Sequence, residues 1–388
     1  MTARSARDVE RVVGAEHPQV PMTASAHGVR LSRLRQSLAE SGLDGFLVSA
    51  LPNVRYLTGF TGSNALVVVT PSDCVLLTDF RYATQVKTEV AREVRVVIET
   101  SSLWTRLWQE LQTLAGTKVL AFESAHVTHQ DAARFLDAAS DGSRWLWRPA
   151  INLVEVLREV KDADELGLIR RAVRIAETAL AATLPQVHVG MTELAVAGIL
   201  ERELRTAGSE GFPFETIIAA GARSALPHAR ASTNVIARGD LLLIDFGAIH
   251  AGYCSDLTRT VVVGAAPTAR QLEVHTAVRE ANGSASALIR AGMRGRDADA
   301  LARDYIQRLG YGDAFGHSLG HGIGLEVHES PRVAKTAESP LPAGSVVTIE
   351  PGIYLEEWGG VRIEDDVVLT SEGPHVLSRF DRTLLQVG

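Results

Sequence analysis

The sequence predicts a two-part α/β protein whose second part is internally duplicated. Strands and helices alternate from about Leu31 onward, which is typical of compact α/β domains. A stretch that begins with Gly-Met also recurs, because Gly190 and Gly292 start, and Gly208 and Gly310 end, two similar segments that lie 102 residues apart. The length of 388 residues is sufficient for two domains, each with its own core.

The composition excludes several classes of protein. There are 39 Lys and Arg against 46 Asp and Glu, so the formal net charge is −7, and no block of basic residues offers a nucleic-acid interface. No apolar run approaches the roughly 18 residues that cross a bilayer. Cys74 and Cys254 are too few for a disulfide framework, and the N-terminus has no apolar signal segment. We therefore expect a cytoplasmic protein that binds neither nucleic acid nor membrane.

The first part is predicted to be an α/β domain over residues 28–155. It follows a flexible extension, residues 1–27, in which Met22 is a second candidate for the natural start. An amphipathic helix is expected over 31–43, a short strand over 45–50 and a further strand over 65–70, with Gly and Asn at the turns.

The second part, residues 156–388, is predicted to contain two related α/β halves. Asp162 is a candidate N-cap with Glu165 three residues later, and apolar residues at helical spacing follow. Each copy of the repeat is preceded by a helical pattern and followed by a glycine-rich stretch and a hairpin pattern. Two such halves are expected to place helices on one side of a sheet and to leave a cleft between them.

Each half carries a pair of carboxylates in its hairpin. Asp245 and Asp256 are equidistant from a turn predicted at His250-Ala251, so we expect them to be cross-strand neighbours. Glu350 and Glu364 are likewise equidistant from Glu357, beside Gly359-Gly360.

The strands that carry these carboxylates are strongly apolar, so unpaired charges there would be costly. Two divalent cations would balance four carboxylates, as in two-metal hydrolases. One imidazole from the segment GHSLGHGIGLEVHE, residues 316–329, would complete the site. Histidines outside such context, among them His126, are expected to be ordinary surface or core residues.

Six sequence motifs carry a resemblance to a known family. LLIDFGAIHAGYCSDLTRT, GHSLGHGIGLEVHE, IEPGIY and GVRIEDDVVLT resemble the dinuclear metallopeptidases of the creatinase, prolidase and methionine aminopeptidase family, which share the pita-bread fold. NVRYLTGF and LLTDFRY resemble the creatinase-like N-terminal domain of the Xaa-Pro branch. The resemblance implies a creatinase-like α/β domain followed by a pita-bread domain with a pseudo-two-fold internal repeat.

The resemblance also implies roles for individual residues. The metal ligands would be Asp245, Asp256, His321, Glu350 and Glu364, with Asp256 and Glu364 bridging two ions. Glu350 would move the proton as general base and then acid.

Further roles come from the same resemblance, which also includes the segment SALPHA, residues 224–229. His228 and His328 would be the catalytic histidines, and His317 and Arg362 would contact the substrate or orient other groups. Tyr354, with Phe212 and Phe214, is expected to line the pocket that receives proline, and packing in the core is the alternative for the two phenylalanines.

The predicted activity is hydrolysis of the bond between an N-terminal residue and proline. Proline-containing peptides are therefore the expected substrates, and an Xaa-Pro dipeptidase (prolidase) is preferred over an aminopeptidase P that acts on longer peptides. A dipeptidase needs an arginine for the free carboxylate, and Arg55 and Arg81 are candidates, with surface ion pairs as their alternative. A creatinase-like hydrolase and a non-catalytic scaffold are more distant alternatives, opposed by the complete ligand set. Manganese is the expected metal, with cobalt and zinc as alternatives, and a homodimer is expected from the resemblance.

Overall fold

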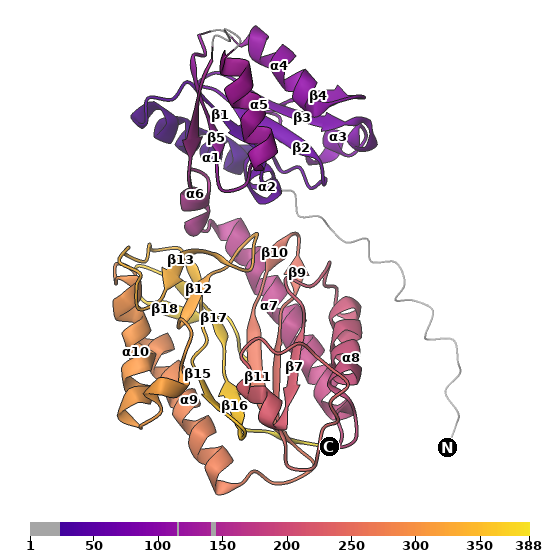
Figure 1. Ribbon diagram of the computed structural model, residues 1–388, viewed down its shortest axis with the longest axis vertical. Coiled ribbons are helices and arrows are strands. Elements are labelled where there is room, and N and C mark those ends of the chain that lie inside the picture. The colour runs from indigo at the N-terminus through magenta and orange to yellow at the C-terminus, as the bar shows by residue number, and fades with distance from the viewer. Residues whose placement is uncertain (1–23, 115, 141–144) are drawn as a thin grey trace, which may run out of the picture.

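The computed structural model describes residues 24–114, 116–140 and 145–388, which form two parts joined by a short helix (Figure 1). The predicted extension, 1–27, lies outside the described residues up to residue 23, and Met22 lies there too. The last four residues of that range begin helix α1 (Ala24–Glu40). Among the described helices, none has the length and apolar character needed to cross a membrane.

A six-stranded mixed sheet forms the first part, with the strand order β4-β3-β2-β1-β5-β6. Its strands are β1 (Gly45–Val48), β2 (Ala65–Val69), β3 (Cys74–Asp79), β4 (Arg95–Glu99), β5 (Val119–Glu123) and β6 (Leu146–Ala150). Every residue of β1 and β2 is buried, because helices cover both faces of the sheet.

Five helices make the two outer layers of this part. Apolar side chains of α1 pack on one face of the sheet together with α2 (Leu51–Thr58) and α3 (Val86–Glu89). The other face is covered by α4 (Leu103–Thr113) and α5 (His129–Ser140), where Phe135 stacks on Trp147. A single turn of 3-10 helix, Phe80–Tyr82, follows β3.

The connection to the second part is short, and ion pairs hold the two parts together beside it. Helix α6 (Glu155–Glu159) leads into α7 (Ala163–Thr183), and the predicted division at residues 155 and 156 falls at the start of α6. Asp162 and Glu165 form the predicted capping box of α7. Arg30 of α1 reaches across to Asp162 at 2.8 Å and Glu165 at 3.1 Å, so the first part is held against the N-terminus of α7.

The predicted duplication is present in the helices. The α8 helix (Glu193–Thr206) follows α7, and α10 (Gly295–Arg308) follows α9 (Ala269–Leu288). Helices α8 and α10 begin and end 102 residues apart, in agreement with the sequence repeat. Gly190 and Gly292, at the start of the two copies, have φ values of 91° and 85°, which glycine adopts without strain.

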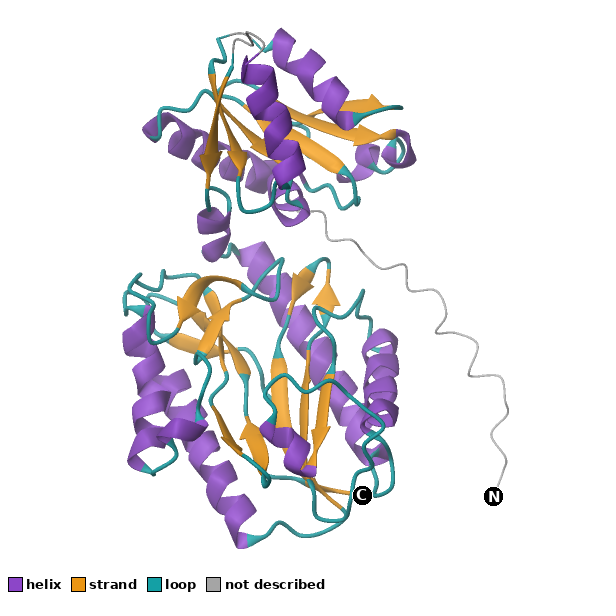
Figure 2. Cartoon of the chain, viewed as in Figure 1, coloured by secondary structure: helices purple, strands orange, loops and turns teal. Residues whose placement is uncertain are grey.

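Two sheets lie between the helix pairs (Figure 2). The first half has the strand order β19-β11-β8-β7, and the second half has β13-β12-β14-β17-β18. The strands of the first sheet are β7 (Ile217–Ala220), β8 (Leu241–Phe246), β11 (Leu257–Val263) and β19 (Gln386–Val387). Those of the second sheet are β12 (Gly320–Gly322), β13 (Glu329–Val333), β14 (Val346–Ile349), β17 (Asp365–Leu369) and β18 (Pro374–Val376).

Each half also has a small hairpin. One consists of β9 (Ile249–His250) and β10 (Tyr253–Cys254), and the other of β15 (Gly352–Leu355) and β16 (Gly359–Arg362). Single 3-10 turns occur at Leu184–Gln186, Gly221–Ala225 and Gly312–Ala314. The helices α7 and α8 pack on the first sheet and α9 and α10 on the second, so the inner faces of the two sheets remain available for a site.

One predicted register is wrong and the other is confirmed. Asp245 pairs with Thr258, not with Asp256, because the turn lies at Ala251-Gly252 rather than His250-Ala251. Both turn residues have positive φ, 45° and 73°, as a two-residue hairpin turn requires. The second hairpin is centred on Glu357 as predicted.

Candidate active site

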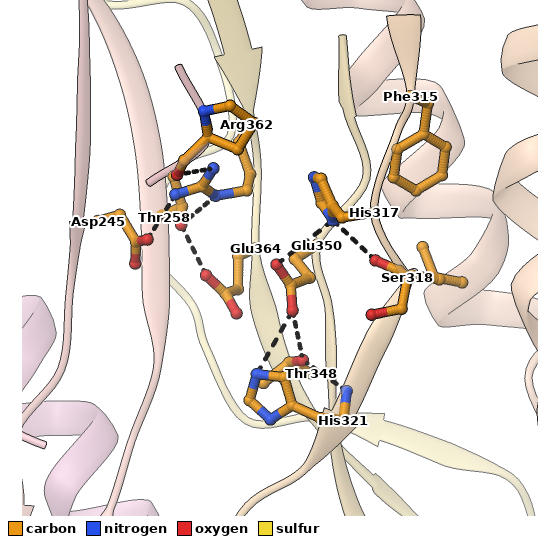
Figure 3. Close-up of polar contacts among 12 residues, drawn as sticks. Asp245, Thr258, Phe315, His317, Ser318, His321, Thr348, Glu350, Arg362 and Glu364 are labelled. Carbon is orange, nitrogen blue, oxygen red and sulfur yellow. Dashed lines mark hydrogen bonds and ion pairs between the residues drawn. The ribbon is translucent and has the colours of Figure 1, made fainter. Parts of the chain in front are cut away.

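The five predicted metal ligands lie on or directly beside strands of both halves. Figure 3 labels four of them, Asp245, His321, Glu350 and Glu364, and their side chains point toward one space. The first half contributes Asp245 from β8 and Asp256 from just before β11. From the second half come His321 on β12, Glu350 directly after β14 and Glu364 between β16 and β17.

The distances among these side chains suit a shared cation. Ligand atoms of Asp256, His321 and Glu364 all lie within 4.8 Å of one another. His321 Nε2 is 3.4 Å from Glu350 Oε1 and 3.8 Å from Asp256 Oδ2. The structure therefore brings His321 together with carboxylates from both halves of the repeat.

Burial of the side chains is the largest cause of the pKa shifts in this group. Burial and then the negative charges of Glu364 and Asp245 raise the pKa of Asp256 well above its usual range. Burial raises the pKa of Glu350 to about 8, although the nearby Arg362 opposes the shift. Burial also lowers the pKa of His321 to about 4, so this imidazole is neutral and able to act as a ligand.

The donor set fits divalent cations. Asp245 Oδ1 and Asp256 Oδ1 are buried and accept no hydrogen bond within the described part of the chain. Such acceptors carry a large desolvation cost unless a cation or donor faces them. Four carboxylates with one imidazole form an oxygen-rich site of the kind that first-row divalent metals occupy.

Hydroxyl groups hold two of the carboxylates from behind. Thr258 Oγ1 donates to Glu364 Oε2 at 2.6 Å, and Thr348 Oγ1 donates to Glu350 Oε1 at 3.2 Å. The Thr348 hydroxyl also accepts the backbone N–H of His321 at 3.1 Å. These contacts fix the orientation of the candidate ligands, as the outer shell of a metal site does.

Arg362 organises the other side of the site. Its Nη2 donates to Asp245 Oδ2 at 2.5 Å, and its Nη1 donates to the Tyr354 hydroxyl at 2.7 Å. The Tyr354 hydroxyl and His317 Nε2 are 2.9 Å apart. Arg362 thus contacts a carboxylate and a tyrosine of the site, in a position to orient both.

A cavity of about 910 Å³ opens over these groups. His228, His317 and His328 all line it, together with the five candidate ligands. The His328 ring lies edge-on to His321, with 4.4 Å between the ring centroids. The structure therefore brings the three predicted histidines to the same cavity as the carboxylates.

The structure brings only some of the other predicted substrate-binding residues to the cavity. Phe214 lines the cavity, whereas Tyr354 is not among the residues that line it and Phe212 packs against the core of the first half. Arg55 does not line it either, because its guanidinium lies against Gly252 at the tip of the β9-β10 hairpin. Arg81 forms an exposed ion pair with Asp79 at 2.8 Å, which is the alternative considered for it.

Several residues that line the cavity were not predicted from the sequence. Arg332, on β13, is exposed in the cavity wall and has no ion-pair partner among the residues that the structure describes. His126 and Glu155, which are 3.1 Å apart, line the cavity from the first part of the chain, and Arg158 lines it from the connecting helix α6. His126 was expected to be an ordinary histidine. The closeness of Arg332 to His328 in the chain was the one available signal.

A duplicated α/β domain that gathers four carboxylates and a histidine in a cavity defines a metal-dependent hydrolase. The chain belongs to metallopeptidase family M24. The model of this family matches residues 167–371, and the model of the creatinase/prolidase N-terminal domain matches residues 30–160. The family, the fold and the enzyme class predicted from the motifs are therefore confirmed, and the family implies the use of divalent metal.

Similar proteins cover almost the whole chain. The "Uncharacterized peptidase YqhT" of Bacillus subtilis is 41% identical over 92% of this chain and 99% of its own. The "Xaa-Pro dipeptidase" of Pyrococcus furiosus is 35% identical over the same shares.

Solved structures agree in fold. The "Xaa-Pro dipeptidase from Bacillus anthracis" has a TM-score of 0.88 and 38% identity, covering 93% of this chain and 100% of that one. The "X-Pro aminopeptidase from Thermotoga maritima MSB8" has a TM-score of 0.83 and 40% identity, covering 92% and 99%.

Proposed function

We propose that the protein is an Xaa-Pro dipeptidase that uses two divalent cations to hydrolyse the bond between an N-terminal residue and a C-terminal proline. The observation that carries the dipeptide preference is Arg332, a cavity arginine without an acidic partner among the described residues. Relatives named as Xaa-Pro dipeptidases support the same substrate class.

The four arginines that line the cavity differ in whether they are free to bind the carboxylate of the substrate. Arg158 is engaged with Glu326 at 2.8 Å, Arg362 with Asp245, and Arg230 with Glu215 at 3.2 Å. Arg332 is the fourth, and its guanidinium is available for bidentate contact with a free carboxylate. A dipeptide presents that group at a fixed distance from its scissile bond, whereas a longer peptide does not.

Asp245, Asp256, His321, Glu350 and Glu364 would hold the cations. Bound there, the cations would lower the pKa of a water molecule and polarise the scissile carbonyl. The oxygen-rich donor set favours manganese, with cobalt and zinc as alternatives.

The proton transfers fall to Glu350. Its carboxylate takes a proton from the attacking water and delivers it to the proline nitrogen, which has no hydrogen of its own while the peptide bond is intact. His228 and His328 donate hydrogen bonds to the oxygen that becomes negative as the carbonyl is attacked. His317 contacts the proline side of the substrate, and the Tyr354 hydroxyl, 2.9 Å from His317 Nε2, orients that imidazole.

A second candidate function is that of an aminopeptidase P, which releases the first residue from longer Xaa-Pro peptides. A neighbour of 40% identity that is named an X-Pro aminopeptidase supports it. The two functions separate on product analysis by mass. We expect Ala-Pro to be cleaved at least about tenfold more efficiently than Ala-Pro-Ala, a difference of about 1.4 kcal/mol in transition-state binding. Efficient release of alanine from Ala-Pro-Ala would contradict the dipeptidase and favour the aminopeptidase.

We also infer a cytoplasmic homodimer. Cys74 and Cys254 are both buried free thiols, which suits a reducing compartment. The dimer is proposed from the family resemblance.

A further inference from the structure

The loop that carries His328 is attached to the first part of the chain. It runs from Gly324 to His328 between β12 and β13, and glutamates stand on both sides of the histidine, at 326 and 329. Because His328 lies against His321, a small displacement of this loop would move the imidazole relative to the candidate metal ligands.

Arg158 of α6 contacts both glutamates. Its Nη2 is 2.8 Å from Glu326 Oε2 and also forms an ion pair with Glu329 Oε1. The Arg158 side chain is only 3% exposed and that of Glu329 only 5%. Lys161 adds a contact to Glu329 at 3.3 Å, and the Glu326 backbone N–H donates to Glu329 at 2.9 Å. One guanidinium therefore holds the chain on either side of His328.

The other side of Arg158 is joined to the first part. Its Nη1 donates to Asn53 Oδ1 at 2.7 Å, and Asn53 Nδ2 donates to Glu123 at 2.7 Å and Glu155 at 2.6 Å. Glu123 in turn accepts the backbone N–H of Ala50 at 2.7 Å, at the start of α2. Asn53 is fully buried and belongs to the NVRYLTGF motif, for which the hydrolytic site provides no other role.

Packing reinforces this ionic attachment. Leu325 of the loop packs against the apolar core that α1 and α2 share with the first sheet. A side chain at Gly324 would come within 2.8 Å of the Glu329 carboxylate, so glycine leaves room for that carboxylate. The loop is therefore held at two points, one apolar and one charged.

We propose that Arg158 is a positioning residue through which the N-terminal part of the chain fixes His328 in the active site. The inference rests on the catalytic role proposed above for His328. Arg158 acts through the loop rather than on substrate, because both of its Nη atoms are engaged by protein groups.

Arg30 offers a matched control. It is similarly buried, at 2% exposure, and joins the same two parts through Asp162 and Glu165, which lie at the N-terminus of α7 and not in the His328 loop. A change at Arg30 therefore weakens the attachment of the two parts without releasing His328.

The experiment is a double-mutant cycle between Arg158→Met and His328→Ala, with Arg30→Met as the control. For Arg158→Met we expect kcat on Ala-Pro to fall on the order of 10- to 100-fold, as a displaced catalytic group produces, with bound manganese and KM near wild type. In the His328→Ala background the same substitution should cost less than about twofold, because the residue through which it acts is gone. Arg30→Met should lower the unfolding temperature and leave kcat unchanged.

Two results would overturn the inference. One is wild-type kcat in folded Arg158→Met enzyme, and the other is a cycle in which the two losses simply multiply. If Arg158→Met does not fold, Glu326→Gln replaces it under the same criteria, since the Glu326 side chain is 41% exposed. Wild-type kcat in His328→Ala would instead overturn the role proposed for His328, and the positioning with it.

Discussion

The hydroxyl of Thr258 donates a 2.6 Å hydrogen bond to Glu364, across the two halves of the duplicated domain. Thr258 belongs to β11 of the first half and Glu364 to the second half. Arg362 makes the reciprocal contact, from the second half to Asp245 of the first. Neither half alone therefore assembles the site, and each orients a carboxylate that the other supplies.

Replacing Thr258 by valine should weaken metal binding. The substitution keeps the shape of the buried side chain but removes the donor to Glu364, and loss of such an outer contact typically costs about 10- to 100-fold in metal affinity. Competition with a chelator measures the change. Thr258→Ser keeps the hydroxyl and should stay within a few-fold of wild type, and equal losses in both variants would speak against the hydrogen bond as the cause.

Replacing His328 by alanine should separate catalysis from metal binding. The side chain lines the cavity beside His321, and its proposed role is a hydrogen bond to the substrate oxygen, not coordination of a cation. We expect kcat to fall about 100-fold or more, with metal content unchanged. Loss of metal in this variant would mean that His328, and not His321, is the histidine ligand of the metal.

Replacing Arg332 by methionine should affect substrates with a free carboxylate next to the scissile bond. We expect kcat/KM for Ala-Pro to fall about 10- to 100-fold, because a charge-assisted bidentate contact is lost. Hydrolysis of the amide Ala-Pro-NH2 should hardly change, since it lacks the carboxylate. A parallel loss on both substrates would show that Arg332 does not select the carboxylate.

The contribution of Glu350 to the stability of the metal-free protein should fall as the pH rises. The pKa of Glu350 is raised from 4.5 to about 8 by burial, so between these values the folded protein keeps a proton that the unfolded chain has released. Raising the pH through this range therefore favours unfolding.

Urea unfolding of chelator-treated protein at about pH 5.5 and about pH 8 tests this effect, with Glu350→Gln as the comparison. The variant cannot ionise at this position, so its stability relative to wild type should increase with pH. A difference that stays constant would contradict a raised Glu350 pKa.

Local sequence patterns predicted much of the fold and of the site. The 102-residue repeat and the capping box at Asp162 are properties of neighbouring residues, and both are present in the structure. The predicted pairing of Asp245 with Asp256 was wrong by two residues, because the turn lies one residue further along, at Ala251-Gly252, where glycine accommodates a φ of 73°. The glycine was a signal that could have placed the turn correctly.

Contacts between distant segments could not be predicted in this way. Arg55 was selected for its motif, yet its guanidinium lies on Gly252 of the hairpin tip. Arg158 and Arg332 reach the cavity only because α6 and β13 meet beside it. Their positions depend on how the two parts of the chain pack, which no local pattern of residues specifies.

The most direct test of the account is to measure bound metal and Ala-Pro hydrolysis on the same preparations of wild type, Glu364→Ala and Glu356→Ala. Glu364 is buried in the site, whereas Glu356 is an exposed acid at the neighbouring hairpin turn and serves as the control. We predict two equivalents of divalent metal and full activity in wild type and Glu356→Ala, and loss of both in Glu364→Ala. Full hydrolysis by Glu364→Ala with undiminished metal would contradict the two-cation site.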